Sequence, residues 1–326
     1  MYQITEKEII RNWDFARGIL VSIDCSTYNH EQYISQALNG FLKQKTNFHF
    51  EIIVHDDAST DNTAKIIKKY QSQFPYLFRC IYQSENQYSK NEKNIWGDIT
   101  FPLARGKYIA LCEGDDYWTD PFKLQKQVDF LENNKDYSIC FHRYKILDQE
   151  SQIFRDDNCG FLFDNLTYCG AEINTELFLK HWVTQPATMV FRKDCFDISV
   201  IKKYHYFRDT HLIYHLLQNG KGYLFEFEGA VYREHLGGIS SKKPWKHQVD
   251  MGIAVAKELF LVNNNNTILK DNFLKMLNWG IHYYSSNKNI SWNFFQYILS
   301  HFYYSLSWKR LLKHTRLIFL QKNLVG

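Results

Sequence analysis

The chain has no Cys-x-x-Cys pair, although seven cysteines are spread over its 326 residues. An odd number of cysteines without paired spacing argues against a disulfide or zinc framework. Four of them lie in or beside apolar runs, as is typical of buried, reduced thiols: Cys25, Cys80, Cys112 and Cys140. We therefore expect a reducing compartment, and the cytoplasm fits this best.

Long apolar runs and strong net charge are also lacking. No stretch reaches the roughly 18 apolar residues that span a bilayer. Residues 1–8 carry two acidic groups and no apolar core, so we do not expect a secretory signal there. The net charge of +4 is too small to favour a nucleic-acid partner. With 45% hydrophobic residues the composition is that of a folded protein with a sizeable core.

Short apolar runs alternate with amphipathic segments between residues 19 and 140. We expect strands at 19–23, 50–54, 77–82 and 108–112, each followed by a helix; Ser59–Asp61 and Asp120-Pro121 are expected helix starts. This alternation predicts an α/β fold with a mostly parallel central sheet flanked by helices, whose ligands bind beyond the carboxyl ends of the strands. Later, helices are expected at 171–181 and 209–218, and strands at 187–191 and 222–227.

The C-terminal segment has no acidic residue after Asp271, whereas seven basic residues follow. Apolar residues fall on one face of a predicted helix: Phe294, Phe295, Ile298, Leu299, Phe302 and Leu306. A basic helix with an aromatic face suits a peripheral contact with a membrane. Packing of the same face on the protein itself explains the pattern equally well.

Two polar loops follow the first two predicted strands. Residues 26–30 (Ser-Thr-Tyr-Asn-His) could cradle a nucleotide base or phosphate, although polar residues are common in any such turn. In the second loop Ser59 or Asp61 fits a helix cap, but the adjacent carboxylates of Asp56 and Asp57 exceed what a cap needs. One of them could accept a hydrogen bond from a uracil imide or a ribose hydroxyl.

The turn Glu113-Gly114-Asp115-Asp116 follows the fourth predicted strand. Three carboxylates in four residues repel one another unless a cation joins them, and oxygen ligands of this kind select Mg²⁺ or Mn²⁺. Such an ion could bridge the phosphates of a nucleoside diphosphate. A solvated acidic turn is the alternative, and we favour the metal site.

The order of these motifs, with Gly106–Ile109 running into the acidic turn, resembles family 2 glycosyltransferases with the GT-A fold. The resemblance covers about residues 21–241 and is strongest up to 130. It implies an inverting transfer from a nucleotide-sugar donor, above all a UDP-sugar, to a glycan or lipid-linked glycan in surface polysaccharide biosynthesis. Ser26, where the family often has Pro, is a departure without expected consequence.

The resemblance also implies roles for residues in the first three loops. Thr27, Tyr28 and Asp57 would contact the nucleoside, with Asp56 beside them. Asp115 would serve the nucleotide and the metal, and Asp116 the metal. Glu113 stands where the family commonly has Asp, so its partner could be the metal, the ribose or the donor sugar.

Later residues match the family less tightly. Asp209 would be the general base that deprotonates the acceptor, although a helix cap explains it too. His235 would ligate the metal or bind a phosphate, and Arg233 and Lys93 could contact the diphosphate.

We expect an N-terminal extension at 1–18, a catalytic domain at 19–245 and a helical, basic and aromatic segment at 246–326. The catalytic domain would comprise a nucleotide-binding half, 19–135, and an acceptor-binding half, 136–245. A nucleotidyltransferase would need a glycine-rich, basic first loop, and a non-catalytic binding module would have lost the acidic turn or the base. A dinucleotide oxidoreductase would need Gly-x-Gly-x-x-Gly after the first strand.

Overall fold

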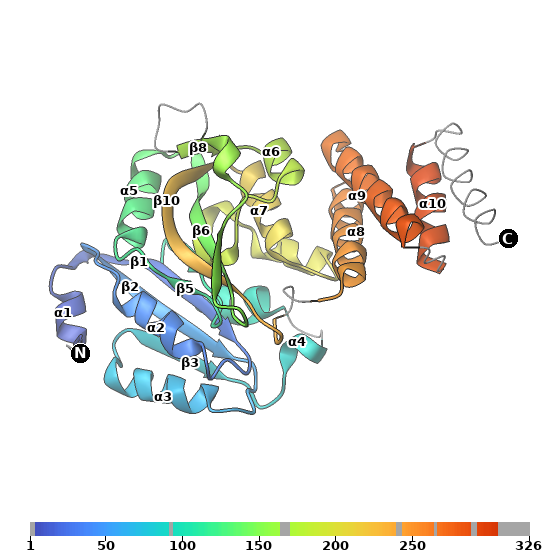
Figure 1. Cartoon of the computed structure of the whole chain (residues 1–326). Helices are drawn as coiled ribbons and strands as arrows, with labels where there is room; N and C mark the ends of the chain where they lie inside the picture. Colours follow the sequence, from blue (N-terminus) through green and yellow to red (C-terminus); the bar gives the residue numbers. More distant parts are fainter. Residues whose placement is uncertain are drawn as a thin grey trace. The chain divides into compact units, whose positions relative to one another are not determined.

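The computed structural model in Figure 1 describes residues 4–90, 94–163, 170–238, 243–263, 266–287 and 292–305. The chain divides into two compact units, which we describe separately. The first comprises Met1–Lys202 and Phe207–His235, and the second comprises Lys203–Tyr206 and Leu236–Gly326.

The strands of the first unit form one sheet in the order β3-β2-β1-β4-β9-β6-β10-β5, with β7 paired to β6 and β8 paired to β10. Their bounds are β1 Asp14–Thr27, β2 Phe48–Asp56, β3 Phe78–Tyr82, β4 Tyr108–Leu111, β5 Tyr117–Trp118, β6 Tyr137–Asp148, β7 Ile153–Asp156, β8 Gly170–Ile173, β9 Val190–Arg192 and β10 Lys221–Glu234. The four strands β3, β2, β1 and β4 are parallel, as predicted. Beyond β4 the sheet is mixed, because β9 is antiparallel to both β4 and β6.

The parallel part of the sheet is covered on both faces. All nine residues of β2 are buried, the pattern of a strand covered on two sides. Helix α2, Ile34–Leu42, turns Ile34, Leu38 and Phe41 into the core, and α3, Thr63–Gln73, packs beside β3 and β2. These two helices lie next to the blue strands in Figure 1.

The remaining helices of this unit are short or moderate in length. They are α1 Glu6–Ile10, α4 Gln87–Lys90, α5 Lys123–Asn133, α6 Thr175–Lys180 and α7 Asp209–Gln218. A π-helix occupies Ile95–Thr100, and 3-10 turns occupy Phe101–Leu103, Gly160–Leu162, Pro186–Thr188, Lys193–Cys195 and Ile198–Lys203. The helix expected between the third and fourth strands is therefore replaced, in the described residues, by α4, the π-helix and a 3-10 turn.

Three local predictions need correction. The helix expected at 171–181 begins only at Thr175, because residues 170–173 form β8 and pair with β10. The strand expected at 187–191 is a 3-10 turn begun by Pro186, with strand only from Val190. Asp120 is not the N-cap of α5, which starts at Lys123; its Oδ1 accepts a hydrogen bond from the Phe122 N–H instead.

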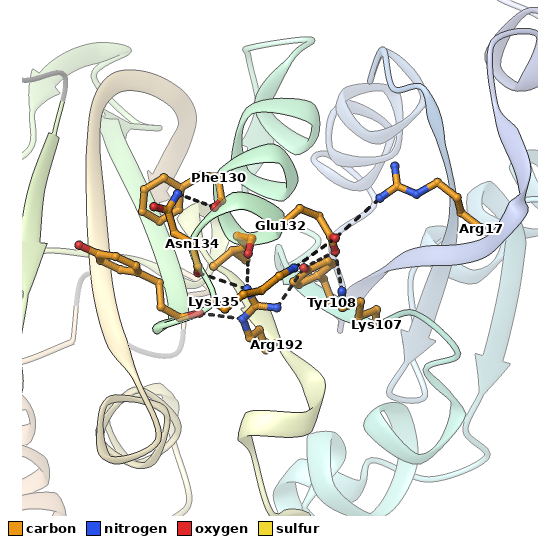
Figure 2. A network of polar contacts seen from close by, with 10 residues as sticks. Arg17, Lys107, Tyr108, Phe130, Glu132, Asn134, Lys135 and Arg192 are labelled. Atoms are coloured by element: carbon orange, nitrogen blue, oxygen red, sulfur yellow. Dashed lines mark hydrogen bonds and ion pairs between the residues drawn. The ribbon is translucent and has the colours of Figure 1, made fainter.

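A polar network joins the end of α5 to β4 and β9, as Figure 2 shows. Arg192 donates to the Tyr137 carbonyl at 2.8 Å, to the Asn134 carbonyl at 3.3 Å and to the Tyr108 hydroxyl at 3.1 Å. Tyr108 in turn donates to Glu132 Oε1 at 2.5 Å. Carbonyls at a helix C-terminus lack intrahelical donors, so this buried arginine fixes the end of α5 against the sheet.

The second unit contains α8 Trp245–Val262, α9 Thr267–Ser286 and α10 Trp292–Ser305. Asp250 of α8 joins the three helices by accepting hydrogen bonds from Tyr284 of α9 at 2.8 and 2.9 Å and from Tyr297 of α10 at 2.7 Å. Apolar residues from all three helices, Ile253, Leu277 and Phe294 among them, form its core.

The apolar face predicted for 294–306 is divided between core and solvent. Phe294 and Ile298 are buried, whereas Phe295 and Leu299 are exposed, and Leu306 lies outside the described residues. Packing within the protein thus explains the apolar residues on one side of α10 but not the exposed apolar residues on the other side. In the described part of the chain, no helix has the length and hydropathy needed to cross a bilayer.

Candidate active site

The candidate residues gather at one edge of the sheet. Strands β1, β2 and β4 run in the same direction, and β10 shares it because β10 is parallel to β6 and β9 is antiparallel to both β6 and β4. The short strand β5, directly after the acidic turn, pairs with β10 at Ala230 and Val231. This pairing brings residues 113–116 beside the end of β10.

The first two loops are joined by reciprocal hydrogen bonds. Asn29 Oδ1 accepts from the Thr60 N–H at 2.8 Å, and Ser59 Oγ accepts from the Asn29 N–H at 2.9 Å. Thr63 Oγ1 accepts from the His30 N–H at 2.8 Å. Asn29 has φ of 55°, a left-handed conformation that asparagine tolerates better than most residues. We call this set of contacts the loop clasp.

Thr27, Tyr28 and Asp56 lie beside the loop clasp at the ends of β1 and β2. Thr27 Oγ1 and Asp56 Oδ1 are buried and have no hydrogen-bond partner within the described residues, whereas Tyr28 is 42% exposed. Burial raises the pKa of the Asp56 carboxyl above its usual range. Buried polar atoms without partners are costly, and a ligand hydroxyl or imide could satisfy them.

Both carboxylate oxygens of Asp57 accept hydrogen bonds from backbone N–H groups. Its Oδ1 accepts from the Gln87 N–H at 2.7 Å and its Oδ2 from the Tyr88 N–H at 3.0 Å, so it caps the first turn of α4. Tyr88 presents its hydroxyl to the Arg208 guanidinium at 3.2 Å. Asp57 therefore links the second loop to the residue before the candidate base.

Gly114 lets the acidic turn lie against the end of β1. A Cβ added there would lie 2.6 Å from Thr27 Oγ1, 2.8 Å from Thr27 Cβ and 3.0 Å from Ile34 Cδ1. The Gly114 N–H also donates to the Ser26 carbonyl at 3.0 Å. No side chain fits at this position without displacing the first loop.

Asp115 and Asp116 have different surroundings. Asp116 is 1% exposed, and its Oδ1 accepts from the Arg233 N–H at 2.8 Å. Burial raises its pKa well above the usual range, with the charge of Asp115 adding to the effect. For Asp115 burial acts in the same direction, but the facing His30 and His235 outweigh it and hold its pKa below the usual range.

Arg233 is held within the protein rather than projecting into solvent. Its Nε donates to the Asp115 carbonyl at 2.8 Å and its Nη2 to Gln36 Oε1 at 2.7 Å, and Nη1 also donates to Gln149. The guanidinium lies 4.7 Å from the centre of the Tyr33 ring. In this arrangement it positions the acidic turn.

Glu113 and Asp209 come close enough for their charges to interact. Burial raises the pKa of Glu113 to about 8, with contributions from the charges of Asp115 and Asp209. Burial also raises the pKa of Asp209, whose Oδ1 accepts from the Thr210 N–H at 2.7 Å. The structure thus brings the acidic turn and the first residue of α7 into one site.

Two groups of side chains offer ligand atoms near enough to one another to share a cation. One is Glu113, Asp115 and Asp116, and the other is His30, Asp115 and His235; within each group the ligand atoms lie within 4.8 Å. Asp115 Oδ1 and Asp116 Oδ2 are buried without a partner among the described residues. These donor sets fit the expected divalent ion.

Sequence reasoning did not assign a role to His30, Tyr88 or Arg208. His30 stands in the loop that was singled out, but nothing in its spacing relates it to Asp115, 85 positions later. The pairing of β1 with β4 brings His30 near the acidic turn, and the pairing of β10 with β5 brings His235 there. Lys93 lies outside the described residues.

Solved structures of two glycosyltransferases share this fold. S. aureus TarS in complex with UDP-GlcNAc superposes with a TM-score of 0.64, at 16% identity, over 88% of this chain and 81% of that one. The mannosyltransferase PcManGT from Pyrobaculum calidifontis, in complex with GDP-Man and Mn²⁺, gives a TM-score of 0.51 at 13% identity, over 94% and 86% of the chains. The predicted GT-A fold is confirmed.

Sequence relatives agree with the fold. An uncharacterised protein of Mycobacterium tuberculosis is 35% identical over 224 residues, which is 67% of this chain and 60% of that protein. The chain thus spans about three fifths of that relative's length. The UDP-Glc:alpha-D-GlcNAc-diphosphoundecaprenol beta-1,3-glucosyltransferase WfaP of Escherichia coli is 29% identical over 226 residues, 69% of this chain and 81% of that protein.

The family itself is shown by a sequence profile. Residues 22–199 match the profile of glycosyl transferase family 2, a range that includes the loop clasp, Gly114 and the acidic turn. Asp209, Arg233 and His235 lie beyond that range and join the site through α7 and β10. On this match and on the shared fold, the chain belongs to glycosyl transferase family 2.

Proposed function

We propose that the protein transfers a sugar, with inversion, from a nucleotide-sugar donor to a hydroxyl of a glycan or lipid-linked glycan. One observation carries this proposal: Asp209 lies close enough to Glu113 of the acidic turn for their charges to interact. Family membership adds weight, as does the UDP-GlcNAc bound in the structure of TarS. A UDP-sugar is the donor we favour.

Asp209 is the proposed general base. The acceptor O–H bond breaks as its proton passes to a carboxylate oxygen of Asp209, and the freed electron pair forms a bond to the anomeric carbon. The bond from that carbon to the donor's phosphate oxygen breaks on the opposite face, and its electrons leave with the nucleoside diphosphate. Attack opposite the leaving group inverts the anomeric centre.

The other residues bind and orient the donor. Thr27 and Asp56 offer the nucleoside polar atoms that are buried without partners among the described residues. Asp115, Asp116 and His235 would hold Mg²⁺ or Mn²⁺, which when bound supplies positive charge that stabilises the diphosphate leaving group. Arg233 fixes Asp115 and Asp116 through its side chain and its backbone N–H.

The test is transfer or slow hydrolysis by purified protein in a panel of UDP-, GDP- and dTDP-sugars with Mg²⁺ or Mn²⁺. We expect one donor to be consumed and Asp116→Ala to abolish that activity. Full activity in Asp116→Ala, with unchanged metal dependence, would refute its role. Tight binding of nucleoside triphosphates without binding of nucleoside diphosphates would favour a nucleotidyltransferase instead.

We further propose that the acceptor belongs to surface polysaccharide synthesis and is reached at a membrane. The E. coli relative is named for a diphosphoundecaprenol acceptor, which is a lipid-linked sugar. Exposed apolar residues on one side of α10 give the second unit a surface that could contact lipid: Trp292, Phe295, Leu299 and Tyr303.

A further inference from the structure

His30 lies near Asp115 and His235, two of the three residues already proposed to bind the metal. Its Nε2 lies 3.6 Å from Asp115 Oδ2, and His235 Nε2 lies 3.1 Å from the same oxygen. Neighbouring ligand atoms on an ion with bonds of about 2.1 Å are about 3.0 Å apart in octahedral and about 3.4 Å apart in tetrahedral geometry. The observed separations are near both values, so one ion could contact all three atoms after small movements.

Among the described residues, the His30 ring makes no hydrogen bond that would explain its position. Nδ1 is buried without a partner in the described part of the chain, and 3.6 Å is too long for a hydrogen bond from Nε2. The backbone N–H of His30 is fixed by Thr63 through the loop clasp, and the ring stands edge-on to His235 at 6.0 Å. The fold therefore places the His30 imidazole next to Asp115, with Nδ1 making no hydrogen bond to the described residues.

A second, independent observation points to a ligand here. The side chain of Asp116 is almost wholly buried, yet its Oδ2 has no partner among the described residues. The second oxygen of the Asp115 carboxylate, Oδ1, is also buried without a hydrogen-bond partner among the described residues. Buried carboxylate oxygens without donors are expected where a cation completes the site.

We propose that His30 joins Asp115, Asp116 and His235 as a ligand of the divalent ion of the proposed glycosyltransferase site, so that this site prefers first-row transition ions over Mg²⁺. The inference rests on the proposed function only in assigning the ion to the donor site. Imidazole nitrogen is a ligand that transition ions accept readily, whereas Mg²⁺ prefers oxygen and water. The competing group, Glu113, Asp115 and Asp116, contains only carboxylates and would show the opposite preference.

The experiment measures Mn²⁺ and Mg²⁺ binding to the full chain, with and without UDP, in the wild type and in His30→Gln. Free Mn²⁺ is quantified by its EPR signal, and pulsed EPR detects nitrogen bound to Mn²⁺. We expect nitrogen modulation in the wild type, weaker modulation in His30→Gln and a Mn²⁺ Kd raised about 10-fold or more. Mg²⁺ should compete poorly in the wild type and better in the variant.

Controls separate ligand loss from misfolding. His205→Gln replaces an exposed histidine outside the group and should leave Mn²⁺ binding unchanged. His30→Asn, and the double variant His30→Gln/His235→Gln, should show less nitrogen modulation and none, respectively. Equal thermal melting of metal-free wild type and variants confirms the fold.

Unchanged nitrogen modulation and an unchanged Mn²⁺ Kd in His30→Gln would overturn the inference, as would purely oxygen coordination in the wild type. The proposed function fails separately. Nitrogen-bound Mn²⁺ in a protein that consumes no nucleotide sugar would leave the metal site intact and refute the transferase activity.

Discussion

A methyl group added at Gly114 would meet both the side chain of Thr27 and that of Ile34. Because Ile34 belongs to the core and Thr27 ends β1, neither can move without disturbing its strand or helix. We expect Gly114→Ala to lower the free energy of unfolding by about 1–3 kcal/mol, the usual cost of overpacking, and to weaken UDP binding. Urea denaturation and isothermal titration measure the two effects.

Gly160→Ala is the matched control, since its new Cβ would meet only Arg143 Nη2, at 3.9 Å. It should leave stability and UDP binding close to those of the wild type. A Gly114→Ala protein as stable and as competent in UDP binding as this control would contradict the close packing described for the acidic turn.

The pH dependence of transfer follows from Asp209. A base must be ionised to accept a proton, and burial raises the pKa of this carboxyl. We therefore expect kcat/KM to fall as pH falls through the raised pKa, with an acid limb above the ordinary value of about 4 for aspartate. Asp209→Asn should lower kcat by roughly 100-fold to 10,000-fold, the usual contribution of a positioned base.

Asp194→Asn, which changes an exposed aspartate, should keep both the rate and the acid limb. If Asp209→Asn retained the wild-type rate, another carboxylate would have to be the base. Glu113, the neighbour with a strongly raised pKa, would be the first alternative.

At the scale of elements, the parallel strands could be predicted because their residues are locally consistent. Residues 50–54 are apolar except for Glu51, and a strand buried on both faces is typically rich in apolar residues. Helix α7 was predicted with its observed bounds, since its acidic first residue and apolar periodicity agree. In these segments the local sequence and the tertiary packing favour the same secondary structure.

Segments whose structure depends on distant partners could not be predicted. Residues 170–173 form β8 only because β10, 50 positions later, offers an open edge at 222–225. The site shows the same limit. The acidic turn and the two preceding loops were evident in the sequence, whereas the approach of His235 to Asp115 depends on the pairing of β5 with β10.

The second unit should depend on Asp250. Its carboxylate accepts from Tyr284 and Tyr297, hydroxyls on two different helices. Asp250→Ala would leave those hydroxyls without their acceptor, at a cost of about 1–3 kcal/mol for each one that stays buried. We expect α8, α9 and α10 to lose amide-exchange protection together, while α2 and β2 of the first unit keep theirs.

Asp250→Asn retains one acceptor oxygen and should lie between the wild type and Asp250→Ala. Hydrogen exchange followed by mass spectrometry resolves the three helices in one experiment. Equal protection in all three proteins would show that packing alone holds the helices together.

For the whole molecule, the proposed membrane contact predicts binding to vesicles that contain anionic lipid. Leu299 is 60% exposed, so Leu299→Glu should reduce co-sedimentation without altering the fold. Losing the burial of one leucine, about 1.5–3 kcal/mol, corresponds to a drop of roughly 10-fold to 150-fold in partitioning. Donor hydrolysis in the absence of vesicles should be unaffected.

Leu261→Glu is the control, because Leu261 is 45% exposed but lies on α8. It should sediment with vesicles as the wild type does. Absence of the wild type from the pellet at low salt would argue against the contact, as would equal losses in both variants.

The loop clasp limits how donor preference can change during evolution or design. The first loop obtains acceptors for its backbone from Ser59 of the second loop and Thr63 of α3, and the second loop obtains one from Asn29 of the first. A first loop grafted from a relative would arrive without the side chains that hold its shape. Donor preference is therefore expected to pass between members of this family only when both loops are transferred as a pair.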